Sequence, residues 1–382
     1  MESEAVEPVM APERDEIVEE RISVASQRQL IWWRFRKHKV AVAATVIVIG
    51  FYVMVLLADF LATSDPADSE AFRGLMPIQP VYLFDGWKPS LHVCSVSGER
   101  DLVTFKKVYT RDCSVKIPVR IFARGYEYKL FGIIPTDRHL LGMSDDSLRP
   151  EDHIYLLGTD KQGRDMYSRL LFGTRISLTI GLFGVGLSLV VGVVLGAVSG
   201  FYGGMTDNII QRVVEIVRSI PAIPLYMGVA ASFPADWSIL KIYFAITIII
   251  SLFAWTDLAR VVRGRFLTMR DEDFVTAAML VGASQRRIIF RHMLPSFYSH
   301  IIAAATLALP FMIIAETTLS FLGLGLRPPA ISWGTLLQDA QNVQTIALTP
   351  WLLIPAFPVI LVILALNFMG DGLRDAADPY ST

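Results

Sequence analysis

Six apolar segments constrain this chain of 382 residues more than any other feature of its sequence. They cover residues 40–62, 176–199, 209–233, 239–256, 297–322 and 351–369. Each is about the length of a membrane-spanning helix, which needs roughly 20 mostly apolar residues. Backbone N–H and C=O groups find no water in lipid, so the segments predict helices rather than open sheet. We therefore expect an all-α polytopic membrane protein with six transmembrane helices.

The composition agrees with this class of protein, because 53% of the residues are hydrophobic and only 19% are charged. Soluble domains carry roughly 25% charged residues. The segment at 40–62 is longer than the apolar core of a secretory signal peptide, and the polar arm before it is also too long. We expect it to be retained as the first transmembrane helix. The third segment differs from the others, because it begins among charged residues and contains Pro221 and Pro224.

Positive charge beside the spans predicts their orientation, since Lys and Arg are enriched in short cytoplasmic segments. One cluster precedes the first span and another separates the fourth span from the fifth: Arg28, Arg34, Arg36, Lys37 and Lys39, then Arg263, Arg265, Arg270, Arg286, Arg287 and Arg291. With six spans both clusters lie on the same side, so we expect cytoplasmic N- and C-termini. Residues 1–39 then form a cytoplasmic tail, whose acidic first twenty residues are typical of disorder. The formal net charge of -1 does not indicate nucleic-acid binding.

Residues 63–160 are too polar to span a membrane and form an extracytoplasmic insert on this topology. Turn-forming residues separate short β-prone runs at 102–105, 115–117 and 119–122, which predicts a small β-rich domain. Two roles stay open for it: contact with an external partner, or a decoration that stabilises the external face. Cys94 and Cys113, the two cysteines of the chain, both lie here. Disulfides persist on this side, so we favour one bridge over two free thiols.

Small residues recur every four positions along the second span, at Gly184, Ser188, Gly192, Gly196 and Gly200. This spacing puts them on one ridge of a helix, where small side chains allow close helix–helix approach in lipid. We therefore expect the second span to be buried in a helix bundle.

Glu316 lies inside the fifth span, where an acidic side chain is expensive and should face the bundle interior, a partner or a water-filled path. Two interpretations are open. The residue lines the translocation pathway, or it is a hydrogen-bonded packing residue near the outer end of the span, which we favour.

The segment between the fourth and fifth spans, 262–296, predicts a docking loop. Small side chains at Ala277 and Ala278 precede Gly282, which is expected to end a short helix with a low profile. Such a helix can seat in a groove on another protein. The arginines that follow can pair with acidic groups on a partner or with lipid phosphates.

This loop resembles the cytoplasmic signature of the permease subunits of binding-protein-dependent ABC importers, specifically the dipeptide/oligopeptide group. That signature is Glu-Ala-Ala, three residues, Gly, and a spacer ending in Leu-Pro. It is matched by Ala277, Ala278, Gly282, Leu294 and Pro295. Thr276 stands where the family usually has Glu, which puts any contact of that carboxylate in doubt.

Further stretches are similar to the same group: 157–165 with 173–178, 315–325 with 332–334, and 370–375 with 378–379. The resemblance covers about residues 25–60 and 155–380. It leaves out most of the 65–150 insert, which departs from shorter members.

The resemblance implies a permease of the type I importer kind, with a core domain at 161–382 that contains five of the spans. Its implied partners are a second homologous permease, two cytosolic ATP-binding subunits, an extracytoplasmic binding protein and membrane lipid, in a bacterial inner membrane. ATP and Mg²⁺ would bind to the ATPase subunits, with no cofactor on this chain. The residues implied to couple to the ATPases are Asp273, Thr276, Ala277, Ala278, Gly282, Ala283, Ser284, Arg286, Leu294 and Pro295.

Other classes of protein fit less well. The sequence contains neither a phosphate-binding Gly-x-x-x-x-Gly-Lys loop nor a His-Glu-x-x-His zinc motif, so no catalytic or metal-binding residues are expected. A secondary transporter should show a repeated half and coupling acids deep in the membrane. A membrane sensor fits the insert but does not need the docking loop, and a membrane hydrolase would need an activating partner for Ser320 or His300. Peptides are the favoured substrate, with oligosaccharides or nickel chelates as alternatives.

Overall fold

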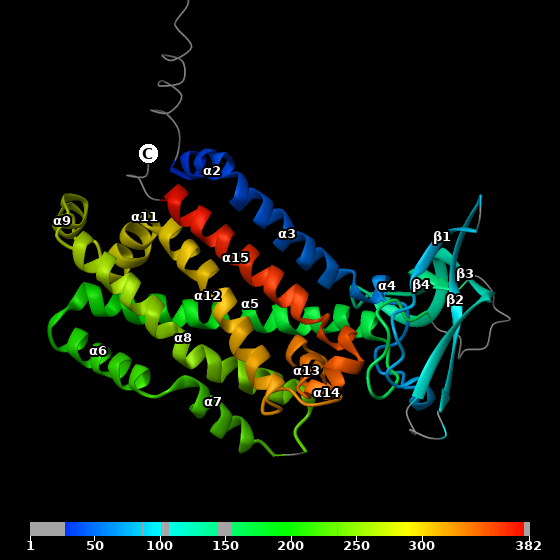
Figure 1. The fold of residues 1–382 in the computed structure, drawn as a ribbon. Helices are drawn as coiled ribbons and strands as arrows, with labels where there is room; N and C mark the ends of the chain where they lie inside the picture. The colour runs from blue at the N-terminus through cyan, green and yellow to red at the C-terminus, as the bar shows by residue number, and fades with distance from the viewer. Residues whose placement is uncertain are drawn as a thin grey trace, which may run out of the picture.

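The computed structural model describes residues 27–85, 87–100, 102, 107–143, 154–234 and 236–377, so the acidic stretch at 1–20 lies outside the described residues. Figure 1 shows a bundle of helices with a sheet at one end. The main helices are α2 (Gln27–Lys37), α3 (Lys39–Leu56), α4 (Ala58–Leu61), α5 (Met166–Tyr202), α6 (Gly204–Ser219), α7 (Ala222–Ala231), α8 (Ile239–Met269), α9 (Asp273–Leu280), α12 (Tyr298–Phe321) and α15 (Ala356–Ala377). Shorter ones are α10 (Gln285–Arg287), α11 (Leu294–Ser296), α13 (Trp333–Gln338) and α14 (Val343–Leu348).

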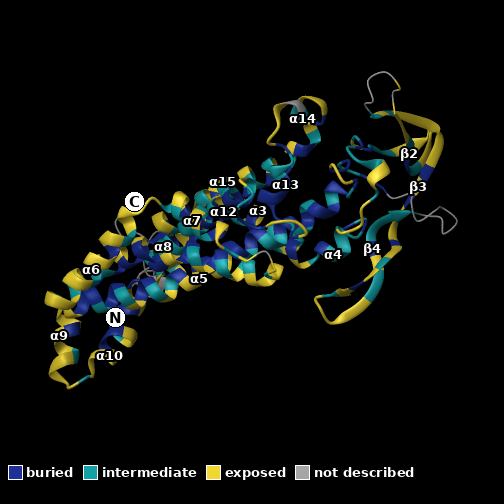
Figure 2. Ribbon diagram, turned by 90° about the horizontal axis from the view of Figure 1, so that it is seen from below, coloured by how far each residue is buried: buried dark blue, intermediate teal, exposed yellow. Residues whose placement is uncertain are grey.

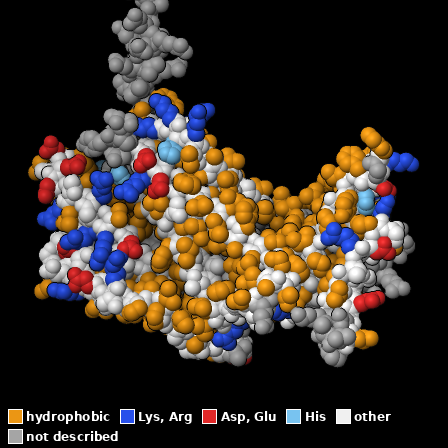
Figure 3. All heavy atoms as spheres, viewed as in Figure 1, with side chains coloured by type: hydrophobic (Ala, Val, Ile, Leu, Met, Phe, Trp, Pro, Cys, Tyr) orange, Lys and Arg blue, Asp and Glu red, His pale blue; other side chains and the backbone are white. Residues whose placement is uncertain are grey.

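Five helical segments of the described chain are long and apolar enough to cross a membrane: Lys39–Leu56, Met166–Tyr202, Ile239–Met269, Tyr298–Phe321 and Pro350–Ala377. They overlap the first, second, fourth, fifth and sixth predicted spans. The helices α5 and α8 extend well beyond the apolar segments that predicted them, because the helical backbone continues through charged residues at their ends. Figure 3 shows hydrophobic side chains over the middle of the bundle and charged side chains gathered near its α2 and α9 end. This distribution is that of a multi-pass membrane protein.

The third predicted span is not one continuous helix. It is divided into α6 and α7, which are bent by 76° at the break between them. Ile220 has an extended backbone before Pro221. A proline lacks the N–H that continues a helix and disfavours helical geometry in the residue before it, which explains the break.

The small-residue ridge of α5 is buried in the bundle, as predicted, and its neighbour there is α8. A Cβ atom added to Gly196 would lie 2.5 Å from the carbonyl oxygen of Ala259, and one added to Gly192 would lie 2.9 Å from that of Trp255. One turn before Gly192, Ser188 donates a hydrogen bond of 3.2 Å to the carbonyl oxygen of Ser251 on α8. The two backbones therefore approach closely enough that only the smallest side chains fit along the seam.

The insert contains a four-stranded antiparallel sheet in the order β1-β2-β3-β4. The strands are β1 (Val81–Asp85), β2 (Lys88–Arg100), β3 (Lys107–Leu130) and β4 (Ile134–Met143). The first part of the long β3 pairs with β2 and its second part pairs with β4. Two of the predicted β-prone runs, 115–117 and 119–122, lie in β3, whereas most of the run at 102–105 lies outside the described residues.

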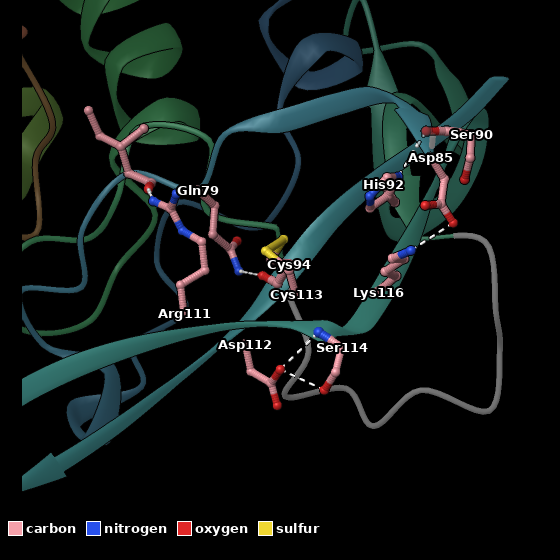
Figure 4. The surroundings of a disulfide bond; sticks show 11 residues. Gln79, Asp85, Ser90, His92, Cys94, Arg111, Asp112, Cys113, Ser114 and Lys116 are labelled. Atoms are coloured by element: carbon pink, nitrogen blue, oxygen red, sulfur yellow. Dashed lines mark hydrogen bonds and ion pairs between the residues drawn. A yellow bond between two sulfur atoms is a disulfide. The ribbon is translucent and has the colours of Figure 1, made fainter. Parts of the chain in front are cut away.

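A disulfide joins Cys94 of β2 to Cys113 of β3 (Figure 4). It sits where the register between the two strands shifts, because Cys94 lies opposite Lys116 while the next residue lies opposite Asp112. Gln79 donates a hydrogen bond of 3.2 Å from its amide to the carbonyl oxygen of Cys94. The bridge therefore closes an irregularity in the sheet, and the Gln79 hydrogen bond ties this point to the segment before β1.

The two ends of the bundle differ. The sheet and α4 lie at one end, while α9 and the N-terminal helix α2 lie at the other (Figure 1). Figure 2 shows that α9 and α10 are largely exposed, in contrast to the buried residues along the bundle axis. The chain entering from α2 and the chain leaving through α15 meet at the α9 end, where Phe35, Ala41 and Ala376 form one buried cluster.

Candidate coupling site

The short helix predicted before Gly282 is present as α9. It begins after Glu272, and the Asp273 carboxylate in its first turn suits the positive end of the helix dipole. Gly282 has a φ of 78° and donates a hydrogen bond of 3.0 Å to the carbonyl oxygen of Met279. The N–H of Ala283 donates a hydrogen bond of 3.0 Å to the carbonyl oxygen of Ala278. This pair of bonds satisfies the last carbonyl groups of the helix and favours glycine at the left-handed position.

The chain then turns back toward the bundle. Ser284 starts α10, since its hydroxyl accepts a hydrogen bond of 3.4 Å from the N–H of Arg287. A π-helical turn at Ile288–Met293 and the short α11 follow, with Pro295 in the first turn of α11. The whole segment therefore forms an elbow between α8 and α12.

One face of the elbow is embedded in the bundle. Val275 is fully buried, and it shares a hydrophobic core with Ile288, Ile289 and Met293. The same core contains Val193 and Phe201 of α5, Val262 and Phe266 of α8, and Ile301 of α12. Because protein interiors are close-packed, α9 is held in direct contact with these three helices through this core.

The opposite face of the elbow is exposed and apolar. Leu280 is 85% exposed and Val281 is 86% exposed, with Phe274 and Met279 also exposed nearby. The side chains of Arg286, Arg287 and Arg291 are exposed along the returning chain. Contiguous exposed apolar residues with a polar rim mark a protein interaction surface.

The structure brings the predicted coupling residues together in this elbow. The exposed ones are Asp273, Thr276, Ala277, Gly282, Ser284, Arg286 and Pro295; Ala278 and Ala283 are half-buried, and Leu294 is buried. The exposed group can contact a partner. The buried and half-buried group can only pass that contact on to the bundle.

A partly buried ion pair beside the elbow was missed by sequence reasoning. Arg263 of α8 donates two hydrogen bonds of 2.6 Å to the carboxylate of Asp207 at the start of α6. The hydroxyl of Ser199 on α5 also donates to Asp207. A paired, bidentate geometry of this kind is strong and directional. It fastens the turn between α5 and α6 to α8, next to the coupling elbow.

Glu316 lies toward the other end of the bundle and is fully buried. Its carboxylate accepts hydrogen bonds from the hydroxyl of Ser177 on α5, at 3.0 Å, and from that of Ser320 on α12, at 2.8 Å. The Ser177 hydroxyl in turn accepts a bond of 3.2 Å from the N–H of Trp333 at the start of α13. The arrangement fits the interpretation of Glu316 as a packing residue that joins α5, α12 and α13.

Replacing Glu316 with alanine is expected to destabilise the folded chain by roughly 1–3 kcal/mol, because two buried hydroxyl groups lose their acceptor. Glu316→Gln retains one acceptor oxygen and a similar volume, so it should lose less. Thermal unfolding in detergent measures both. Equal stability of all three proteins, combined with an uptake defect in Glu316→Gln, would instead favour the pathway interpretation.

Buried polar groups within the stretch 157–178 hold the segment before α5 in place against the start of that helix and against the chain after the first span. The Asp165 carboxylate accepts hydrogen bonds from the N–H of Ser168, at 2.8 Å, and from the hydroxyl of Thr63, at 3.0 Å. Burial raises the pKa of the Asp165 carboxyl, and these hydrogen bonds act in the opposite direction. Asp165 thus caps α5 and ties it to the chain that leaves the first span.

The structure thus combines membrane-crossing helices with an exposed apolar elbow at one end. Comparison with known proteins identifies the class of protein. Residues 192–380 match the family described as binding-protein-dependent transport system inner membrane component. Residues 26–77 match the N-terminal TM domain of oligopeptide transport permease C.

Curated relatives share a large part of the chain. The oligopeptide transport system permease protein OppC of Haemophilus influenzae is 41% identical over 59% of this chain and 70% of its own length. OppC of Bacillus subtilis is 34% identical over 68% of this chain and 79% of its own. The glutathione transport system permease protein GsiD of Pectobacterium atrosepticum is 38% identical over 58% and 72%. Among solved structures, the inward-facing MetNI methionine ABC transporter aligns with a TM-score of 0.43 at 18% identity, over 55% of this chain and 97% of that chain.

The chain belongs to the family of binding-protein-dependent transport system inner membrane components. The resemblance inferred from the Ala277, Gly282 and Leu294 signature is confirmed. The chain is a permease subunit of an ABC importer, and ATP hydrolysis in this family is carried out by separate subunits.

Proposed function

We propose that this permease imports di- and oligopeptides and that its coupling elbow is the docking site of a cytosolic ATPase. The observation that carries the proposal is the elbow itself: an exposed apolar face on α9, opposite the fully buried Val275. When ATP closes the ATPase pair, α9 moves with its partner, and Val275 carries that motion into the core shared by α5, α8 and α12. The names of the relatives support peptides as the substrate class.

The packing of α5 against α8 supports six membrane crossings. Contacts pair Gly184 with Ser251 and Gly200 with Phe266, so the two helices run in the same direction. The chain between them must therefore return across the bundle, through the bent pair α6 and α7. Counted with the five long helices, this pair gives an even number of crossings.

An even number places both ends of the chain on one side, in agreement with the contact between α2 and the end of α15. A cavity of about 340 Å³ at that end is lined by Arg34 of α2, by Glu272 and Phe274 of the elbow, and by Ala376. Helix α2, the coupling elbow and the end of α15 therefore share one side, which we assign to the cytoplasm. The sheet is then extracytoplasmic. The implied partners are a second permease, two ATP-binding subunits carrying ATP and Mg²⁺, and an external binding protein.

Uptake into proteoliposomes tests this function. The chain, co-purified with its partner subunits, would be reconstituted and supplied with binding protein, ATP and labelled peptides, oligosaccharides or nickel chelates in parallel. We expect ATP-dependent uptake of peptides. Uptake of another class alone would overturn the substrate, whereas uptake without any ATPase subunit would overturn the permease mechanism.

The disulfide gives a separate prediction about the insert. Denatured but unreduced chain should not react with a maleimide, and reduced chain should react at Cys94 and Cys113. Replacing both cysteines with serine should destabilise the sheet by about 3 kcal/mol, because the bridge closes a loop between residues 19 apart. Hydrogen exchange of β2 and β3 measures this loss. Reaction of the unreduced chain at both residues would contradict the bridge.

A further inference from the structure

The hairpin formed by the second half of β3 and by β4 exposes apolar side chains that the transport mechanism does not use. Two of them lie at its root, where β3 passes from pairing with β2 to pairing with β4: Ile121 is 60% exposed and Phe122 61%. Three lie at its turn: Phe131 is 56% exposed, Ile133 80% and Ile134 54%. Hydrophobic residues gathered in this way on a surface mark a binding face. The question is what covers them.

The root of the hairpin is fixed to the end of the first span. The ring centroids of Phe60 and Phe122 lie 5.8 Å apart. Tyr126 packs in a cluster with Ala58 of α4 and Leu171 of α5. Only Leu57 separates α4 from α3, so the hairpin begins at the level where the first membrane-crossing helix ends.

The apolar surface of the hairpin continues that of the first span. Val46, Ile49, Val53 and Leu56 of α3 are exposed, as expected for a helix that faces lipid. Figure 3 shows hydrophobic side chains across the hollow between the bundle and the sheet. In Figure 2 the hairpin, labelled at β4, curves past α4 and ends in exposed residues beside the bundle. The hairpin therefore lies beside the bundle, near the level of α4.

The excess of positive charge on the hairpin favours its binding at the headgroup region of a membrane. Residues 119–143 carry four cationic side chains, Arg120, Arg124, Lys129 and Arg138, against the acidic Glu127 and Asp137. Asp137 lies 3.7 Å from Arg124 and 3.8 Å from Arg138, so two of the four cations flank this acidic residue. Apolar side chains that enter the acyl boundary, flanked by basic ones at the phosphates, are the usual composition of a segment lying in a membrane interface.

We propose that the β3–β4 hairpin is a membrane anchor, with Phe131, Ile133 and Ile134 inserted into the lipid leaflet on the sheet side. The basic residues lie against the lipid phosphates, and the Phe60–Phe122 contact couples the anchor to the first span. The anchor holds the sheet at the membrane surface beside the bundle. The orientation proposed above makes this leaflet the outer one, and the proposal depends on that orientation only for the name of the leaflet.

The other edge of the sheet offers a matched control. Trp87 lies in the turn between β1 and β2, and it is as exposed as an isolated side chain, at 101%. Because β1 and β4 are opposite edges of the sheet, this turn shares the insert with the hairpin but not its contact with α4. A property shared by the whole insert would therefore be seen both at Trp87 and at the turn of the hairpin.

The test is lipid-depth quenching in the assembled transporter in proteoliposomes. Ile133→Cys and Trp87→Cys would each be labelled with an environment-sensitive fluorophore under non-reducing conditions, with the unaltered chain as the labelling blank. Doxyl groups carried on the phospholipid would quench from within the bilayer, and iodide would quench from water.

At position 133 we expect blue-shifted emission that doxyl lipid quenches strongly and iodide weakly, with the reverse at position 87. Equal iodide quenching at both positions would overturn the anchor. So would protection of position 133 that appears only when the binding protein is added, since a protein would then cover the hairpin. Iodide placed on one side of the vesicle at a time identifies the leaflet. Peptide uptake by the labelled transporter is recorded separately, so failure of the anchor is distinct from failure of the proposed function.

Discussion

Replacing Gly196 with leucine is expected to separate α5 from α8 and to prevent the chain from folding stably. The first atom of any side chain at this position would lie 2.5 Å from the carbonyl oxygen of Ala259 and 2.8 Å from the Cβ of Val262. Neither is the flexible end of a side chain, so the helices must move apart. Overpacking of this kind costs about 1–3 kcal/mol and occasionally more, and here the clash is with backbone on a packed helix, so we expect the upper end of that range. Thermal unfolding in detergent and the recovery of monodisperse protein measure the loss.

Gly186→Leu is the matched control, because Gly186 lies on the same helix and a Cβ added there meets nothing within 4 Å. It should retain the stability of the unaltered chain. Similar losses in both variants would mean that leucine is harmful anywhere on α5. The close seam with α8 would then not be the cause.

Replacing Val275 with aspartate is expected to abolish ATP-driven uptake. Val275 is fully buried among Ile288, Met293 and the ends of α5 and α8. A carboxylate placed there has no cationic partner in that hydrophobic cluster, and an unpaired buried charge costs several kcal/mol. The elbow should detach from the bundle while the membrane-crossing helices remain inserted. Uptake and proteolysis between residues 270 and 296 report the two effects.

Thr276→Asp is the control for this prediction, since Thr276 is the next residue and is exposed. It introduces the same charge without burying it, so the elbow should stay as resistant to proteolysis as in the unaltered chain. Protease resistance of Val275→Asp equal to that of Thr276→Asp would show that α9 is not held by its buried side chain.

Local sequence patterns predicted most of the helical fold. The spacing of small residues from Gly184 to Gly200 predicted a buried helix, and α5 is buried along that ridge. The third span was predicted as one helix because its composition is apolar. The bend between Ser219 and Ala222 depends on backbone geometry at Pro221, which an average over composition does not capture.

The site was predicted only where its residues are close in sequence. The turn at Gly282 and the short helix before it follow from local propensity and from the family signature. The ion pair between Asp207 and Arg263 joins residues 56 apart, and the bond from Ser177 to Glu316 spans 139. Contacts of this separation depend on how the helices pack, so no pattern in the sequence around either residue indicates its partner.

Purification of the chain from its native membrane in mild detergent, followed by identification of the proteins that accompany it, tests the central claim most directly. The unaltered chain should carry two P-loop ATPases, and the doubly altered Leu280→Asp, Val281→Asp chain should lose them. A chain altered at Val343 and Leu348, which are also exposed but lie on α14 at the opposite end, should keep them. Retention of the ATPases by the α9 variant would contradict the docking site, and transport by a chain without any ATPase would contradict the whole account.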